Sequence, residues 1–186
     1  MIIAVDGPAA SGKGTIARRI ARELNFAYLD TGLLYRGVGV MVLDHGGNPE
    51  DPEAATRAAE AFDPALMADP RLRGDEAAVA ASKVAAIPGV RAAMLEFQRS
   101  FGRTPPDGKK GAVLDGRDIG TAIFPDADVK LFITAAVEVR AERRHKELLE
   151  RGSPSIYARV LQDMQERDQR DRSRSTAPMA IAADAV

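Results

Sequence analysis

Residues 2–15 read IIAVDGPAASGKGT, and this stretch decides the fold. Ile2–Asp6 is a short apolar run that ends in Asp-Gly, which is typical of a buried strand in a parallel sheet. After the stretch, apolar side chains recur every four residues from Ile16 to Leu24 among charged ones, so the pattern predicts an amphipathic helix over 14–25. The residues between strand and helix are glycines and small side chains, so the chain must turn tightly there.

The turn Gly7–Thr15 has the spacing of a phosphate-binding loop, Gly7-x4-Gly12-Lys13. Such a loop curls consecutive backbone N–H groups around phosphate oxygens, and the helix N-terminus adds a favourable dipole. Lys13 is expected to reach the β- and γ-phosphates, and Thr15 supplies the hydroxyl for Mg²⁺ one residue later than usual, because Gly14 follows the lysine. The alternative is a glycine-rich turn that binds no ligand. The predicted cofactor-binding residues are Gly7, Pro8, Ala9, Ala10, Ser11, Gly12, Lys13, Gly14 and Thr15.

Strand-like and helix-like segments alternate along the rest of the chain. Apolar runs predict strands at 26–30, 112–115 and 129–134, and helical patterns predict helices at 32–44, 52–62, 75–86, 90–101, 137–151 and 155–172. We expect 63–74 to be loop and 102–111 to be a linker. The order predicts an α/β fold, a doubly wound parallel sheet whose ligands bind beyond the carboxyl ends of the strands. The residues that end three of these strands, Asp6, Asp30 and Asp115, are therefore expected to face one crevice.

Composition limits the classes of protein that remain. The chain has 186 residues, the length of one compact domain, with 45% hydrophobic and 28% charged residues. Its net charge of −1 gives no basic field for nucleic acid or an anionic membrane. The absence of cysteine excludes disulfides and thiolate zinc sites. Neither a membrane-spanning stretch nor a signal-peptide pattern is present, so we expect a cytoplasmic protein.

Four further stretches carry a resemblance to a known family. LDTGLLYR (29–36), ASKVAAIPGVR (81–91), DGRDIGTAIFPDA (115–127) and ERDQRDRSRSTAP (166–178) resemble, in order, the motifs of bacterial cytidylate kinases. The resemblance implies a single P-loop kinase domain over 1–186, with acceptor-binding helices over 31–101 and a lid hairpin over 137–160. It also implies ATP and Mg²⁺ as cofactors and the phosphorylation of CMP and dCMP to CDP and dCDP. We expect a monomer that binds neither nucleic acid nor a membrane.

The resemblance implies roles at the phosphates for residues whose chemistry suits them. An arginine can fork onto a phosphate, and Arg36, one turn into a helix that Thr31 begins, matches the family's arginine on the acceptor phosphate. Asp115 resembles the strand-end carboxylate that orients the water ligands of Mg²⁺. Arg117 is expected to clamp phosphate and Arg174 to contact the transferring group. With Lys13, these two arginines are the predicted catalytic residues.

The remaining substrate residues are implied to bind the nucleoside. Ser82, Arg91 and Asp118 match the family's cytosine-reading residues. Arg167 and Asp171 match its sugar-binding residues, and they share one helix face with Arg170 and Arg174 at offsets of 0, 3, 4 and 7. The structural alternatives stay open here: a solvated Arg36, a plain helical Ser82, and a salt-bridged surface helix over 167–174.

A predicted lid and two departures from the family complete the analysis. Arg140, Arg143 and Arg144 share a face of a hairpin that could close over ATP, or the hairpin could be a charged surface feature. The segment before Ser82 is shorter than in the family. The chain ends at AADAV, where the family continues, so its C-terminal strand and helix are expected to be missing.

Two other interpretations stay open, one of them from a class other than active enzymes. One is a nucleotide-binding relative with impaired catalysis, and the other is a small-molecule kinase with another acceptor. A nucleic-acid binder that uses the arginine-rich helix is disfavoured, because interleaved acidic residues cancel the field that such binding needs.

Overall fold

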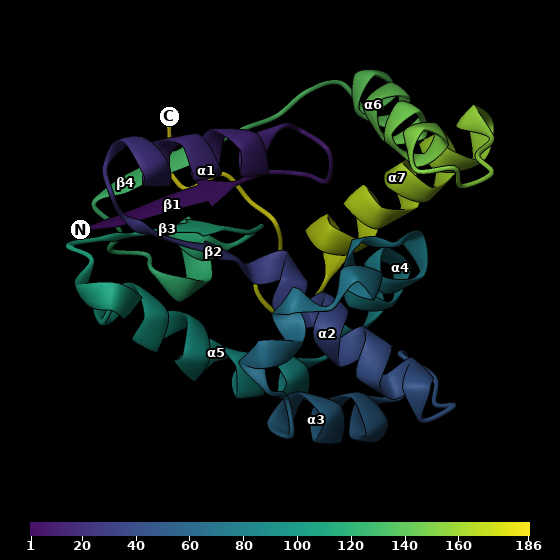
Figure 1. The fold of residues 1–186 in the computed structure, drawn as a ribbon, viewed down its shortest axis with the longest axis horizontal. Helices are drawn as coiled ribbons and strands as arrows, with labels where there is room; N and C mark the ends of the chain where they lie inside the picture. The colour runs from purple at the N-terminus through teal and green to yellow at the C-terminus, as the bar shows by residue number, and fades with distance from the viewer.

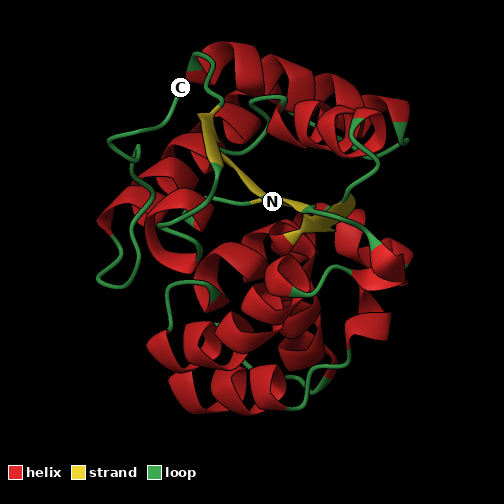
Figure 2. Ribbon diagram, turned by 90° about the vertical axis from the view of Figure 1, so that its left-hand side faces the viewer, coloured by secondary structure: helices red, strands yellow, loops and turns green.

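The computed structural model describes all 186 residues around a four-stranded parallel sheet. Its strands lie in the order β2-β3-β1-β4, and each neighbouring pair is parallel. Their bounds are β1 Ile2–Asp6, β2 Ala27–Asp30, β3 Ala112–Asp115 and β4 Val129–Phe132. Helices lie on both sides of the sheet, as Figures 1 and 2 show. The predicted doubly wound α/β fold of the P-loop type, with its four strands, is confirmed.

Each face of the sheet packs against its own helix, because side chains alternate between the faces along a strand. On one face, α1 (Lys13–Glu23) places Ala17 and Ala21 against Val5 and Val113. On the other face lies α5 (Pro88–Arg103), below the sheet in Figure 1. The small side chains of α1 allow a close approach, which brings its N-terminus to the end of β1.

The helices that follow β2 form a second core beside the sheet. It contains α2, α3, α4 and the beginning of α5, packed around buried aliphatic side chains such as Leu34, Val38 and Val84. The bounds of the first three helices are α2 Thr31–Asp44, α3 Pro52–Glu60 and α4 Asp75–Val84. No single helix of the chain is long and apolar enough to cross a membrane. One pair of segments, α4 and 88–108, would be long and apolar enough if taken together, but the two are bent by 102° relative to each other.

The segment 63–74 is not the loop that we expected. It contains two 3₁₀ helices, η1 (Pro64–Ala68) and η2 (Pro70–Arg73). Each follows an aspartate whose carboxylate accepts a backbone N–H at 2.8 Å, from Ala65 to Asp63 and from Arg71 to Asp69. The loop prediction is wrong because these turns are set by Asp-Pro caps, which the search for hydrophobic periodicity does not detect.

The last third of the chain forms an antiparallel hairpin and then returns to the sheet. The hairpin helices are α6 (Val137–Glu150) and α7 (Tyr157–Ser173), and they lie beside α4, away from the sheet (Figure 1). After α7 the chain returns to β4, where the Val186 N–H donates to Lys130 and its carbonyl accepts from Phe132, at 3.0 and 2.9 Å. The expected linker is shorter than 102–111, because α5 continues to Arg103. It holds the turn η3 (Pro106–Gly108), and a π-helical segment, η4 (Ile119–Ile123), follows β3.

Gly39→Ala is expected to destabilise the fold by about 1–2 kcal/mol. A Cβ at this position would lie 2.7 Å from the Ala80 Cβ and 3.0 Å from the Ala80 backbone carbon. Overpacking costs about 1–3 kcal/mol, and the better helix propensity of alanine offsets up to about 1 kcal/mol of it. Gly37→Ala on the same helix is the comparison, because the nearest atoms to its new methyl, from 2.3 Å, belong to the partly buried side chain of Phe62, which can shift more easily than the backbone of α4. Urea unfolding compares the two; an equal loss of stability would contradict the close packing of α2 on α4.

Candidate functional site

The loop between β1 and α1 has the backbone of an anion-binding nest. Gly7, Ala10 and Gly12 have positive φ angles of 145°, 56° and 95°. Successive N–H groups in such a turn form a concave site for anions, and the N-terminus of α1 lies at its end. A side chain on Gly7 is excluded, since its Cβ would lie 2.0 Å from the Ile133 carbonyl oxygen. The Ser11 hydroxyl is buried without a hydrogen-bond partner, so this loop fits a phosphate chain.

Lys13 begins α1 and lies against the end of β3. Its Nζ is 2.9 Å from an Asp115 carboxylate oxygen, and both side chains are largely buried. Burial, with Arg117 nearby, lowers the pKa of Lys13. Asp30 is the register partner of Asp115 in the sheet, and burial together with Asp115 raises the pKa of Asp30. This end of the sheet therefore holds ionisable groups of both signs next to the phosphate loop.

Of the two residues expected at the metal, Asp115 lies beside the start of α1, and no hydrogen bond joins it to Thr15. Asp115 Oδ2 lies 2.9 Å from the place of a Cβ on Gly14, whereas Thr15 is exposed on the next helical position and makes no hydrogen bond to Asp115. No group of three or more His, Cys, Asp or Glu side chains could hold a metal ion. Mg²⁺ is usually bound by one or two carboxylates together with substrate phosphates. Asp115 therefore fits an ion that arrives with a nucleotide, not a metal held by protein ligands alone.

Asp6 does not share the crevice of Asp30 and Asp115, so this expectation is wrong. The residue of β1 in register with Asp115 is Val5, and the next side chain points to the opposite face of the sheet. There the Asp6 carboxylate accepts the N–H groups of Ile119 and Gly120 at 2.9 and 2.8 Å.

Most of the predicted substrate residues line one narrow cleft. It lies among α2, α4, the turn after β3 and the end of α7, and its volume is about 40 Å³. That is far below the roughly 300 Å³ of a small-molecule site, because charged side chains pair across the cleft. The predicted residues that line it are Thr31, Ser82, Arg117, Asp118, Arg167, Asp171 and Arg174.

Asp118 is the centre of a buried charge network in this cleft. Its carboxylate accepts hydrogen bonds from Arg91 and, at 3.0 Å, from Arg174. Arg91 also donates to the Ala85 carbonyl, and its guanidinium carbon is 5.7 Å from the centre of the Tyr35 ring. Because two guanidinium groups share one buried carboxylate, the network is rigid and carries an excess positive charge.

Ser82 has a partner that was not assigned to the site from the sequence. Its hydroxyl accepts a hydrogen bond from Arg170 at 3.2 Å. Arg170 lies one turn from Arg167 on α7, and that helical spacing is the signal that could have included it.

A second group of cations lies closer to the phosphate loop. The Nε of Arg167 is buried and has no hydrogen-bond partner, and desolvation together with the nearby Arg117 lowers the pKa of this guanidinium to about 9. Asp171 offsets part of this charge and accepts from Arg117 at 3.1 Å. Arg36 donates to the carbonyls of Leu72 at 2.6 Å and Gly74 at 3.4 Å. Guanidinium groups without enough carboxylates form a site that favours an anion.

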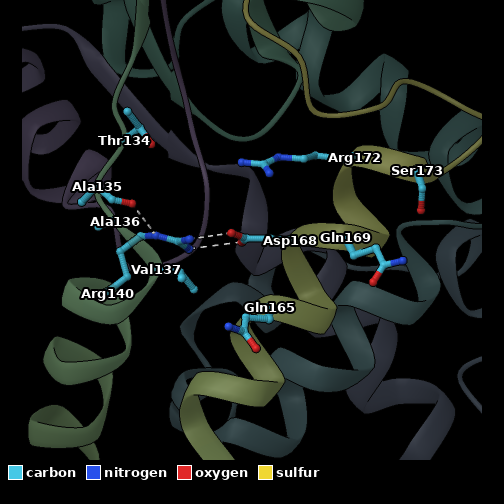
Figure 3. Close-up of a pocket in the computed structure, with 10 residues that line it drawn as sticks. All are labelled: Thr134, Ala135, Ala136, Val137, Arg140, Gln165, Asp168, Gln169, Arg172 and Ser173. Carbon is cyan, nitrogen blue, oxygen red and sulfur yellow. Dashed lines mark hydrogen bonds and ion pairs between the residues drawn. The ribbon is translucent and has the colours of Figure 1, made fainter.

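The three predicted lid arginines contact three different parts of the chain. Arg140 forms a buried ion pair with Asp168 through two hydrogen bonds, 3.1 and 2.5 Å long, and also donates to the Ala135 carbonyl (Figure 3). Arg143 donates to the Ser11 carbonyl at 3.4 Å. Arg144 pairs with Asp75 on α4 and with Glu147 on its own helix. The three side chains thus join α6 to α7, to the phosphate loop and to α4.

A larger cavity opens beside the Arg140–Asp168 pair. Its volume is about 580 Å³, and it lies between 134–137 and the face of α7 that carries Gln165, Gln169 and Arg172 (Figure 3). Arg140 also donates to the Ala9 carbonyl at 3.1 Å, so the cavity adjoins the phosphate loop. Its size is that of a small-molecule pocket.

A phosphate loop on a doubly wound parallel sheet, facing a cleft of arginines, defines the class of P-loop phosphotransferases. A family model described as cytidylate kinase matches residues 3–186. Among curated relatives, "Cytidylate kinase" of Paramagnetospirillum magneticum is 62% identical over 185 residues, covering 100% of this chain and 87% of that protein. "Cytidylate kinase" of Rhodospirillum rubrum is 61% identical over 186 residues, with coverage of 100% and 87%. The chain belongs to the cytidylate kinase family.

A solved structure, "Crystal structure of TT1252 from Thermus thermophilus", is a far weaker match. It is 19% identical, with a TM-score of 0.42, covering 96% of this chain and 85% of that one. A likeness of this size supports no argument about the site.

Arg140→Met is expected to destabilise the protein by about 3 kcal/mol, because it leaves Asp168 buried and unpaired. Lys146→Met on the same helix is the control, since its pair with Glu142 is exposed and worth at most about 1 kcal/mol. Urea unfolding measures both variants. Equal losses would show that the Arg140–Asp168 pair does not hold the hairpin.

Proposed function

We propose that the chain transfers the γ-phosphoryl group of ATP to CMP and dCMP, giving CDP and dCDP. The observation that carries the proposal is a cleft that holds under-compensated arginines and the Asp118 network, next to the pair that Lys13 of the phosphate loop forms with Asp115. Membership of the cytidylate kinase family supports the same substrates. Parallel assays of ATP consumption with CMP, dCMP, UMP and AMP test it, and equal rates with all four acceptors would refute it.

The proposed donor site is the loop Gly7–Thr15. Its N–H groups and Lys13 bind the phosphates of ATP, and the Ser11 hydroxyl gains the partner that it lacks. Mg²⁺, when bound, neutralises charge on the phosphates, and Asp115 is the carboxylate placed to hold its water ligands. The cavity in Figure 3 adjoins the loop and has room for the nucleoside of the donor.

The acceptor phosphate is proposed to bind among Arg36, Arg117 and Arg167. A phosphate offers two negative charges and several oxygens, so it is a stronger partner for Arg36 than the carbonyls of Leu72 and Gly74. It also gives the buried Nε of Arg167 the hydrogen-bond partner that it lacks. This geometry favours Arg167, rather than Arg174, as the arginine at the transferring phosphate.

The base is proposed to lie against Ser82, Arg91 and Asp118. A carboxylate only accepts hydrogen bonds, so Asp118 favours the amino group of cytosine over the corresponding carbonyl of uracil. Arg91 and Ser82 can donate to the ring nitrogen and the remaining carbonyl. Arg174, which binds Asp118 at 3.0 Å, holds that carboxylate in place, while Asp171 and Arg167 lie where the sugar joins the phosphate.

Catalysis in this arrangement depends on position and charge. The acceptor oxygen belongs to a phosphate that is already ionised, so no side chain has to remove a proton from it. We propose that 31–101 forms the acceptor-binding part and 137–160 the lid, which excludes water when it lies against α4. Contacts from Arg144 to Asp75 and from Arg151 to the Arg73 carbonyl support this division. Since the candidate site comes from one chain, we propose that a monomer acts, in the cytoplasm.

Lys13→Ala is expected to lower kcat by about 10²–10³-fold, because Lys13 stabilises charge on the moving phosphoryl group. Lys110→Ala, at an exposed lysine outside the cleft, is the control and should keep the wild-type rate. A coupled assay measures both, and melting temperatures check that each variant is folded. Near-wild-type turnover of a folded Lys13→Ala would refute the phosphate-loop assignment.

Arg91→Met is expected to raise the KM for CMP at least tenfold, and Ser82→Ala severalfold, with the KM for ATP nearly unchanged. Both side chains are proposed to contact only the acceptor base. Arg99→Met is the control, since Arg99 lies on the same helix and donates to the Ile123 carbonyl outside the cleft. If the KM for ATP rises as much as the KM for CMP, the two residues are structural.

A further inference from the structure

The last two residues of β1 hold both ends of the turn that carries Arg117 and Asp118. The Val5 carbonyl accepts the Gly116 N–H at 3.0 Å. The Asp6 carboxylate accepts the N–H groups of Ile119 and Gly120, one on each oxygen, at 2.9 and 2.8 Å. The backbone of Arg117 and Asp118 is therefore held by hydrogen bonds on both sides, at Gly116 and at Ile119 and Gly120.

Asp6 is itself fixed, so it can act as a support. Its backbone pairs with Phe132 of β4, and its carbonyl accepts the Ile133 N–H at 2.8 Å. Its side chain is only 5% exposed. The next residue, Gly7, begins the phosphate loop, so one position joins the donor loop to the turn on the acceptor side.

Only a carboxylate suits both N–H groups. An asparagine has a single acceptor oxygen, and its amide would present N–H to one of the two donors. Burial raises the pKa of Asp6 to about 6, with Asp118 also raising it and Arg117 opposing. The ammonium of Lys130 is engaged elsewhere, by Pro125 and Asp184. The two N–H bonds are thus the main compensation for a buried negative charge.

Gly120 permits this approach. A Cβ on Gly120 would lie 3.1 Å from the Lys130 side chain and 3.4 Å from an Asp6 oxygen. Gly120 is the second residue of η4, which is π-helical, a form found mostly as short insertions at functional sites. A methyl group at position 120 would therefore press on the buried stem of Lys130 and come into contact with the Asp6 carboxylate.

We propose that Asp6 is a positioning residue for the acceptor: through the N–H groups of Ile119 and Gly120 it sets the direction of Asp118, and hence of the arginines that Asp118 binds. Asp6 touches neither substrate. It acts on the base-reading network from the opposite face of the sheet. The inference rests on the proposed function, in which Asp118 reads the base.

The test compares Asp6→Asn with Asp128→Asn. Asp128 is the matched control, because its carboxylate also accepts a backbone N–H of β1, that of Ile2, at the far end of the strand. In Asp6→Asn the KM and the calorimetric Kd for CMP should rise at least tenfold, the preference for CMP over UMP should fall, and the KM for ATP should stay within twofold. Asp128→Asn should keep wild-type values for both substrates.

Gly120→Ala is the second variant and should show the same selective loss. If the variants keep wild-type affinity for CMP, or lose affinity for ATP equally, or if neither folds, the positioning role is overturned. A wild-type protein that binds CMP without transferring phosphate would refute the proposed function alone, since the calorimetric comparison still tests Asp6. A wild type that binds no CMP would overturn both.

Discussion

The pairing of Val5 with Asp115 in the parallel register of β1 and β3 is the constraint on which the site depends. It sends Asp115 and Asp30 to the α1 face, where Lys13 meets them, and Asp6 to the other face, beneath the turn after β3. A shift of one residue would exchange these positions and separate Lys13 from its carboxylate. The phosphate loop and the turn after β3 can therefore both lie at the end of β1 without competing for the same space.

The second constraint is the cost of burying charge. The cleft holds Arg91 and Arg174 against the single carboxylate of Asp118, and it leaves the Nε of Arg167 without a partner. Buried charges of this kind stabilise a fold little, and hydrophobic residues of the same volume often serve stability better. Their arrangement suits the binding of an anionic ligand, because a phosphate would supply the missing negative charge. The narrowness of the cleft has the same origin, because the side chains pair with one another until a ligand replaces those contacts.

Much of this could be predicted from the sequence, and the failures have physical causes. The strands, the long helices and the tight turn between β1 and α1 follow from local patterns, and the structure confirms them. The turns in 63–74 depend on side-chain caps at Asp63 and Asp69, which have no hydrophobic period. The position of Asp6 depends on register, which is set between distant strands. The prediction that Arg167 and Arg174 share one helix face assumed that the helix continues through Arg174. In the structure α7 ends at Ser173, and Arg174 has an extended backbone and binds Asp118.

Residues 72–75, at the start of α4, contact both α2 and the α6–α7 hairpin. Arg36 donates to the carbonyls of Leu72 and Gly74, while the lid binds the adjacent residues, the Arg73 carbonyl through Arg151 and Asp75 through Arg144. Side chains from two different parts of the chain therefore hold four consecutive residues. In the proposed function a phosphate replaces these carbonyls as the partner of Arg36, so the segment that also anchors the hairpin would lose two of its contacts. The 3₁₀ turns before it are short and capped by Asp63 and Asp69, so few residues separate the contacts of Arg36 from those of the hairpin at 72–75.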